Sequence, residues 1–291
     1  MADAWGGMRR GSVRCLTSEG FHRMAYVEWG DPANPRVLVC VHGLTRSSRD
    51  FDVLAQALSS DYRVVCPDVA GRGDSDWLRN PALYVVPTYA AGMATLIART
   101  SMEEVHWLGT SMGGLIGMAL AAMPNTPITR LVLNDVGPVL SAASLARIGT
   151  YVGKAPTFPS IEVAEQYVRA TSATFGPHSD AEWRFLTEHV LRRAPQGGWR
   201  MHYDPAIAVP FLAGVNGEDV AMWNVYDAIR CPTLVLRGRE SDLLSGETAA
   251  AMQQRGPWAR CVEFPGVGHA PTLMHADQIA AVKEFLPGGE K

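Results

Sequence analysis

The most constraining feature of this sequence is a glycine-rich turn between two runs of different character. Gly109-Thr110-Ser111-Met112-Gly113 follows an apolar run at 105–109 and precedes a run of small residues at 113–123. The first run has the pattern of a buried strand and the second that of a helix, so the segment predicts a strand, a sharp turn and a helix. The glycines that flank Ser111 are expected where side chains would collide with neighbouring backbone. Such a turn lifts the Ser111 hydroxyl clear of the sheet.

Apolar strand-like runs alternate with helical runs on both sides of this turn. Further strands are expected at 12–17, 23–29, 36–42, 62–67, 129–135, 232–238 and 260–265, and further helices at 50–58, 86–100, 246–255 and 275–286. This alternation indicates strand–helix–strand units and a mostly parallel sheet with helices on both faces. The first two strands are expected to form an antiparallel hairpin that completes an eight-stranded sheet.

The alternation stops between residues 139 and 229. This segment has no long apolar strand run, and several prolines break its helical stretches. We therefore divide the chain into a flexible tail at 1–11, an α/β core at 12–138 and 230–291, and a mainly helical insertion at 139–229.

Composition limits the partners of the chain. There are 26 Lys and Arg residues against 29 Asp and Glu residues, the net charge is −3, and no basic stripe is present. No nucleic-acid partner is therefore expected. No run approaches the roughly 20 apolar residues of a membrane span. The five cysteines are scattered and lack metal-ligand spacing, which favours a reducing compartment. We expect a cytoplasmic protein with no membrane, metal or cofactor partner.

Four segments resemble the α/β-hydrolase family, and they occur in the family's order. They are His42-Gly43-Leu44, the run 68–75 with the pattern D-x-x-G-x-G-x-S, the run 109–114, and the loop 266–269. The resemblance implies an α/β-hydrolase fold in which the insertion forms a helical cap over the nucleophile. The run 68–75 is interpreted as a structural turn near the site.

The resemblance also implies roles for particular residues. Ser111 is the expected nucleophile, and a serine hydroxyl needs an adjacent base. His269 lies in a glycine loop just after the last strand, where the family has its catalytic histidine. The backbone N–H groups of Leu44 and Met112 are expected to form the oxyanion hole, the pair of donors that stabilises negative charge on the substrate oxygen.

The acid that orients the histidine is predicted to be Asp242. Asp242 follows the strand 232–238 and places the three residues in the chain order that the fold requires. It lies four residues after Gly238, whereas family members often have three. Asp135, at the end of the strand 129–135, and Glu240 remain alternatives.

The insertion is expected to supply apolar walls to a substrate pocket. Trp199, Tyr203 and Trp223 are candidates for this lining. The alternative interpretation is that these aromatic residues form the cap's own core.

The predicted function is a serine hydrolase that cleaves small-molecule carboxylic esters of small to medium acyl chain through an acyl-enzyme on Ser111. One alternative is an enol-lactone or carbon–carbon bond hydrolase of aromatic catabolism. The carbon–carbon enzymes commonly have Asn before the serine and Trp after the histidine, where this chain has Thr110 and Ala270. Another alternative is a non-catalytic ligand-binding or signalling member of the fold.

Overall fold

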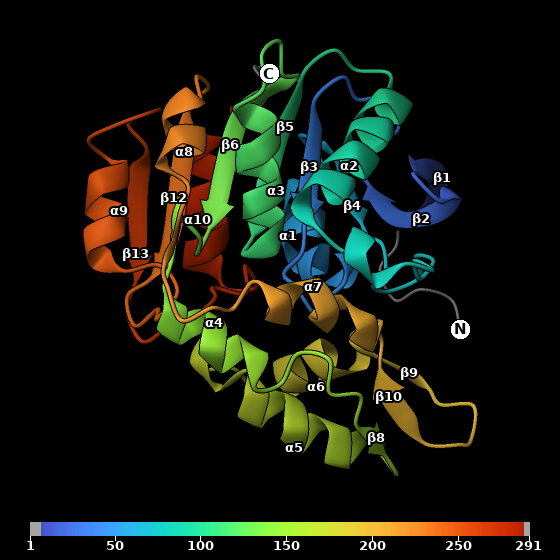
Figure 1. The fold of residues 1–291 in the computed structure, drawn as a ribbon. Coiled ribbons are helices and arrows are strands. Elements are labelled where there is room, and N and C mark those ends of the chain that lie inside the picture. Colours follow the sequence, from blue (N-terminus) through green and yellow to red (C-terminus); the bar gives the residue numbers. More distant parts are fainter. Residues whose placement is uncertain (1–6, 288–291) are drawn as a thin grey trace.

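The computed structural model describes residues 7–287, and one large sheet runs through its centre (Figure 1). Its strands, from one edge to the other, are β1 Arg9–Thr17, β2 Gly20–Trp29, β4 Arg63–Pro67, β3 Val37–Val41, β5 Val105–Thr110, β6 Ile128–Asn134, β12 Thr233–Gly238 and β13 Arg260–Phe264. β2 is antiparallel to both β1 and β4, and the strands from β4 to β13 are parallel. The predicted eight-stranded, mostly parallel sheet is confirmed.

Helices cover both faces of this sheet. One face carries α1 Asp52–Leu58 and α10 Ala276–Phe285, and the other carries α2 Val86–Thr100, α3 Met112–Ala121, α8 Trp223–Ala228 and α9 Gly246–Met252. Along β3, Val39 and Val41 belong to one core, while Leu38 and Cys40 belong to the other. Because both faces are buried, a strand of this sheet is apolar along its whole length rather than at every second residue.

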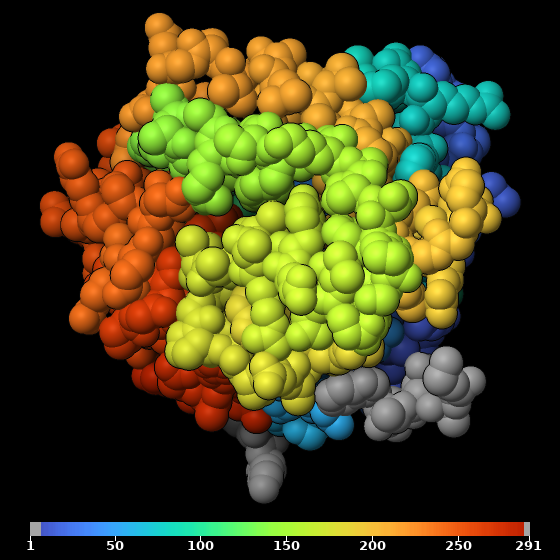
Figure 2. All heavy atoms as spheres, turned by 90° about the horizontal axis from the view of Figure 1, so that it is seen from below, coloured from blue at the N-terminus to red at the C-terminus, as the bar shows by residue number. Residues whose placement is uncertain are grey.

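A smaller layer lies at the edge where the parallel strands end (Figure 1). It contains the helices α4 Ala142–Gly149, α5 Ile161–Thr171, α6 Asp180–Glu188 and α7 Ala208–Ala213. It also holds two small sheets, made by β8 Thr157–Phe158, β10 Trp199–Met201 and β9 Leu191–Arg193, and by β11 Val220–Ala221 and β7 Val139–Leu140. Short 3-10 helices complete the chain: η1 Ser48–Phe51, η2 Pro81–Leu83, η3 Ala173–Phe175 and η4 Pro205–Ile207. Figure 2 shows this layer spread over one face of the molecule.

The structure differs from the predicted organisation of the chain in three ways. Residues 1–6 of the predicted tail lie outside the described residues, but residues 9–11 pair with β2 and belong to β1. The helix α8, predicted within the insertion, packs against α3, and its Tyr226 is fully buried in the main core. The insertion also contains strands of two or three residues, which are too short to produce a recognisable alternation in the sequence.

Candidate active site

The turn between β5 and α3 has the strained geometry that its sequence predicts. Ser111 has φ 51° and ψ −114°, a combination that residues with a side chain rarely adopt. A β-carbon on Gly109 would overlap the backbone of Gly113, and one on Gly113 would overlap the carbonyl of Val41. Glycine at both positions therefore lets the helix approach the sheet closely enough to form this turn.

Three side chains meet at the carboxyl edge of the sheet. The Nε2 atom of His269, in the loop after β13, lies 3.0 Å from Ser111 Oγ, and its Nδ1 atom lies 2.7 Å from Asp135 Oδ2. Asp135 is fully buried directly after β6. Because an ionised carboxylate only accepts hydrogen bonds, Nδ1 carries the imidazole proton and Nε2 accepts from the Ser111 hydroxyl.

The structure corrects the prediction that Asp242 is the acid beside His269. This carboxylate forms an ion pair with Arg147 of α4, with 2.8 Å between Arg147 Nη2 and Asp242 Oδ1, and it is partly exposed. The alternative Asp135 makes the contact with His269 instead. Three residues after Gly238 stands Ser241, whose hydroxyl donates to Asp135 Oδ2 at 2.6 Å.

The chain spacing explains this difference. The Ser241 hydroxyl reaches inward to Asp135, while the carboxylate of the next residue, Asp242, points toward solvent and α4. Glu240 is exposed on the other side of Ser241. In the sequence, the interval of four residues between Gly238 and Asp242, where family members often have three, was the feature that argued against Asp242.

A buried histidine orients one of the two predicted oxyanion donors. His42 Nε2 accepts from the Val69 N–H at 3.0 Å, so its proton is on Nδ1, which donates to the Gly43 carbonyl at 2.7 Å. That carbonyl and the Leu44 N–H belong to one trans peptide and point in opposite directions. His42 therefore turns the Leu44 N–H away from itself. Burial lowers the pKa of His42 to about 4, which keeps the ring neutral near pH 7.

The second predicted donor is at the start of α3. Met112 is the first residue of this helix, where N–H groups have no acceptor within the helix. Among residues 7–287, neither the Leu44 N–H nor the Met112 N–H has a hydrogen-bond acceptor. Both residues line the cavity around Ser111. Both N–H groups are therefore available to a negatively charged oxygen.

The cavity at Ser111 has two arms. We call the first the hydroxyl-rich arm, because its lining includes Thr45, Thr171, Ser172, Thr174 and Thr272 together with Arg46, Asp50, Tyr203 and His269. We call the second the apolar arm, which is lined by Val86, Leu115, Val136, Leu140, Leu145, Ile207, Phe211 and Leu243. Leu44, Ser111 and Ile148 line both arms. The serine thus lies at their junction.

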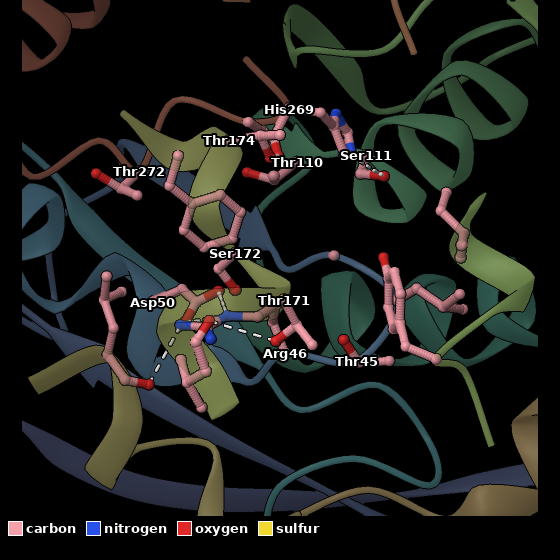
Figure 3. Close-up of a pocket in the computed structure, with 18 of the residues that line it drawn as sticks. Thr45, Arg46, Asp50, Thr110, Ser111, Thr171, Ser172, Thr174, His269 and Thr272 are labelled. Carbon is pink, nitrogen blue, oxygen red and sulfur yellow. Dashed lines mark hydrogen bonds and ion pairs between the residues drawn. The ribbon is translucent and has the colours of Figure 1, made fainter. Parts of the chain in front are cut away.

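A charged pair lies in the hydroxyl-rich arm. Figure 3 shows Arg46 and Asp50 on the opposite side of this arm from Ser111 and His269. Arg46 donates to both carboxylate oxygens of Asp50, with 2.8 Å from Nε to Oδ2 and 2.6 Å from Nη2 to Oδ1. The hydroxyl-rich arm therefore carries both a cation and an anion, and neither residue lines the apolar arm.

The three predicted pocket aromatics have different places. Tyr203 lines the hydroxyl-rich arm, and burial raises the pKa of its hydroxyl to about 12. Trp199 packs in the small sheet of the insertion, with the guanidinium of Arg193 4.0 Å from its ring centroid. Trp223 packs on the main core beneath Arg255. Neither tryptophan lines an arm. The alternative interpretation, packing in the cap's own core, describes Trp199, whereas Trp223 packs on the main core and fits neither interpretation.

The described residues contain neither a cluster of metal-binding side chains nor a membrane-spanning helix. Within residues 7–287, no group of three or more His, Cys, Asp or Glu side chains is arranged to hold a metal ion. In the same range, no helix has both the length and the apolar character needed to cross a bilayer.

A mostly parallel sheet whose carboxyl edge carries a hydrogen-bonded serine, histidine and aspartate defines the class of α/β hydrolases. The sequence model of the alpha/beta hydrolase family matches residues 38–282. This chain belongs to that family and is a hydrolase.

Known proteins resemble the chain over nearly its full length. A 3-hydroxybutyrate-oligomer hydrolase from Cupriavidus necator is 51% identical over 288 residues, which cover 96% of this chain and 98% of the relative. An esterase from Mycobacterium tuberculosis is 27% identical and covers 90% of this chain and 84% of its own. The crystal structure of an alpha/beta hydrolase from Novosphingobium aromaticivorans superposes with a TM-score of 0.85 at 38% identity, over 95% of this chain and 97% of that one.

Proposed function

We propose that this chain is a serine esterase that cleaves short linear oligomers of 3-hydroxyacids through an acyl-enzyme on Ser111. The observation that carries the serine chemistry is the hydrogen-bonded series from Ser111 through His269 to Asp135. The 51% identity to a 3-hydroxybutyrate-oligomer hydrolase supports the choice of substrate. Each link in such an oligomer is an ester between one carboxyl group and the next 3-hydroxyl group.

Acylation begins when Ser111 Oγ attacks the ester carbonyl while His269 Nε2 takes its proton. Asp135 stabilises the imidazolium that forms, because its buried carboxylate accepts from Nδ1. The carbonyl oxygen becomes negatively charged and accepts from the Leu44 and Met112 N–H groups. The intermediate then collapses, the C–O bond to the alcohol breaks, and the leaving oxygen takes the proton from His269 Nε2.

Deacylation repeats the sequence with water. His269 Nε2 takes a proton from a water molecule, and the resulting hydroxide attacks the acyl carbon of the Ser111 ester. The second tetrahedral intermediate releases Ser111 Oγ, which recovers its proton from His269. The fragment that gains a free 3-hydroxyl group leaves in the first half of the cycle. The fragment that was bound to Ser111 leaves as a free acid in the second half. Each fragment is a 3-hydroxyacid or a shorter oligomer.

The two arms support one orientation of the substrate. The leaving oxygen must lie beside His269, which lines the hydroxyl-rich arm and not the apolar arm. Met112, an oxyanion donor in this proposal, lines the apolar arm. The leaving group, which ends in a carboxylate in a 3-hydroxyacid oligomer, therefore occupies the hydroxyl-rich arm that contains Arg46. The acyl group extends into the apolar arm.

The test uses the linear dimer and trimer of (R)-3-hydroxybutyrate, with product release followed by chromatography and mass spectrometry. The wild-type protein is expected to release monomer from both, and Ser111→Ala is expected to be inactive. Methanol added as a competing nucleophile should give one ratio of methyl ester to acid for every ester that shares an acyl group, because all of them pass through the same acyl-enzyme.

A set of other substrates decides between the proposed function and its alternatives. Turnover of p-nitrophenyl butyrate without cleavage of the dimer would retain the esterase and reject the oligomer substrate. Preference for an enol-lactone over every linear ester would favour the lactonase alternative. A folded wild-type protein that neither turns over any of these compounds nor reacts with diethyl p-nitrophenyl phosphate at Ser111 would refute the serine chemistry.

A further inference from the structure

Arg72 is a fully buried cation that lacks an acidic partner. It lies in the turn after β4, and none of its side chain is exposed to solvent. In the part of the chain that the structure describes, Arg72 forms no ion pair, and its donors reach neutral groups. Arginine side chains are almost never fully buried unless a carboxylate pairs with them, because burying a charge costs free energy.

The neutral acceptors account for the orientation of the guanidinium. Nη1 donates to the Ala70 carbonyl at 2.8 Å and to the Tyr89 hydroxyl at 2.9 Å. The guanidinium carbon also lies over the rings of Tyr84 and Tyr89, at 5.7 Å and 5.1 Å from their centroids. Ring faces carry partial negative charge and stabilise a cation without neutralising it. The site thus retains a fixed positive charge.

An acidic group of this cluster, Asp204, bonds to the hydroxyl of one of these tyrosines. Asp204 accepts from the Tyr84 hydroxyl at 2.6 Å, while Arg72 lies over the face of the Tyr84 ring. The carboxylate therefore bonds to the tyrosine hydroxyl and makes no direct contact with the guanidinium. In an interior of low dielectric constant, the field of such a cation extends to its neighbours with little screening.

Two of those neighbours are the proposed oxyanion donors. Arg72 Nε donates to the Leu44 carbonyl at 2.8 Å, and Arg72 Nη2 lies 3.6 Å from Met112 Sδ. The guanidinium therefore contacts both residues, and both line the cavity at Ser111. Leu44 is therefore held through both of its peptide groups. His42 donates to the Gly43 carbonyl of the preceding peptide, which carries the Leu44 N–H, and Arg72 donates to the Leu44 carbonyl of the following peptide.

We propose that Arg72 is a positioning residue that holds the oxyanion donors in place and supplies an unpaired positive charge behind them. This inference rests on the proposed function, because it requires an oxyanion at Ser111. The neutral ester gains little from a distant positive charge, whereas the negatively charged tetrahedral intermediate gains more. Arg72 should therefore stabilise the transition state selectively and affect kcat rather than KM.

The experiment compares a transition-state mimic with a ground-state mimic in Arg72→Gln. The first ligand is 1,1,1-trifluoro-2-octanone, which adds to a serine as a charged hemiketal, and the second is 2-octanone, which binds as a neutral ketone. We expect the trifluoroketone to bind about 10- to 100-fold more weakly and kcat for p-nitrophenyl butyrate to fall by a similar factor. The Kd of 2-octanone and KM should change by less than about threefold. Arg72→Lys keeps the charge with fewer donors and should recover part of the lost trifluoroketone affinity.

The matched control is Arg63→Gln, which removes another buried arginine. Arg63 lies at the start of β4, paired with Glu28 at 2.9 Å, and it does not line either arm. Arg63→Gln should lower the Tm of the protein and leave its affinity for the trifluoroketone unchanged. Equal weakening of both ketones in folded Arg72→Gln would show a merely structural role, and unchanged affinity for both would also overturn the proposal.

If Arg72→Gln does not fold, Arg72→Lys alone decides the inference. The substitution must then reduce the affinity for the trifluoroketone, relative to wild type, by a larger factor than it reduces the affinity for 2-octanone. Failure of the proposed function is a separate result. A wild-type protein that forms no hemiketal at Ser111, measured by 19F NMR, would remove the oxyanion itself and with it the role of Arg72. Normal hemiketal formation in wild type and in Arg72→Gln alike would reject Arg72 while leaving the serine chemistry intact.

Discussion

Asp135 can remain charged in the interior because three donors point at its two oxygens. Gly238 N–H donates to Oδ1 at 2.9 Å, and Ser241 Oγ and His269 Nδ1 lie 2.6 Å and 2.7 Å from Oδ2. A buried carboxylate with fewer donors would pay a large desolvation cost. At the scale of single residues, this set of donors distinguishes Asp135 from Asp242, whose partner Arg147 is at the partly exposed rim.

This difference predicts opposite results for two conservative substitutions. Asp135→Asn should lower kcat for p-nitrophenyl butyrate by about 10³- to 10⁴-fold, because an amide cannot hold the imidazole in the required tautomer or stabilise the imidazolium. Asp242→Asn should stay within about threefold of wild type, since partly exposed ion pairs contribute little. Steady-state kinetics on both folded variants make the comparison. The reverse order of activities would restore Asp242 as the acid.

His42 predicts a dependence of stability on pH. Its pKa is lowered from 6.5 to about 4 in the folded protein, so the unfolded chain binds its proton more readily. Above pH 6.5 His42 is neutral in both the folded and the unfolded protein, and its contribution to the free energy of unfolding is at its full value. As pH falls from about 6.5 toward 4, protonation of His42 in the unfolded chain lowers the free energy of unfolding, by about 2 kcal/mol between about pH 7 and pH 5. Burial lowers the pKa of His106 and His189 to about 4 as well, and they add to the wild-type slope.

Urea unfolding of wild type and His42→Asn between about pH 7 and pH 5 measures this effect. The variant should lose about 2 kcal/mol less over this range than wild type does, because its residue 42 no longer titrates. Leu54→Ala is the control, since it removes a buried side chain and should lower the free energy of unfolding equally at each pH. If His42→Asn loses as much free energy of unfolding between about pH 7 and pH 5 as wild type does, His42 is not the cause of that loss.

At the scale of elements, the approach of α3 to the sheet is what exposes Ser111, the proposed nucleophile. Trp107 of β5 stabilises the contact between α3 and the sheet, because its Nε1 donates to the Gly113 carbonyl at 3.1 Å. The strand, the turn and the first turn of the helix therefore form one packed unit around Ser111. A larger residue at the contact must move the helix and, with it, the Met112 N–H.

Gly113→Ala should show this coupling. The added β-carbon would overlap the Val41 carbonyl, so we expect a loss of about 1–3 kcal/mol in the free energy of unfolding together with a lower kcat. The matched substitution is Gly246→Ala at the start of α9, where the nearest heavy atom would be 3.8 Å away. That variant should be unchanged or stabilised by about 0.4–1 kcal/mol. Thermal unfolding and activity assays would compare the pair, and equal effects would argue against a packing constraint at residue 113.

At the scale of the whole molecule, the insertion encloses the site that the core builds. Helices α4, α5 and α7 supply walls to the two arms, while Ser111, His269 and Asp135 come from the core. The insertion also contacts the turn that holds Arg72, because Gly73 N–H donates to the His202 carbonyl at 2.9 Å. Changes in the insertion are therefore expected to alter which ester binds more than how the bond is cleaved.

Leu145→Trp tests the assignment of the arms. Leu145 of α4 lines the apolar arm and not the hydroxyl-rich arm, so a larger side chain should obstruct long acyl groups. We expect kcat/KM for p-nitrophenyl octanoate to fall by about tenfold or more, with p-nitrophenyl acetate changed by less than about threefold. Octyl acetate, which carries its long chain on the alcohol, is the matched substrate and should resemble p-nitrophenyl acetate. Obstruction of octyl acetate alone would reverse the assignment.

The pattern of the chain was sufficient to predict the core of this protein. Continuous apolar runs, helical stripes and glycines at 109 and 113 are local features, and each one restricts its own segment to a strand, a helix or a tight turn. The eight-stranded sheet and the turn at Ser111 follow from them. The short strands of the insertion escaped prediction because two or three residues carry no period.

The sequence alone determined where the serine and the histidine lie, because each is held by a motif in its own segment. Only the tertiary structure decided which carboxylate meets the imidazole, which aromatic residues reach the cavity, and that a buried arginine contacts both proposed oxyanion donors. Those contacts join residues as distant as Asp135 and His269, or Leu44 and Arg72. Their geometry depends on how separate strands and loops pack together, and the interval of four residues after Gly238 does not by itself show that Ser241 points inward and Asp242 outward.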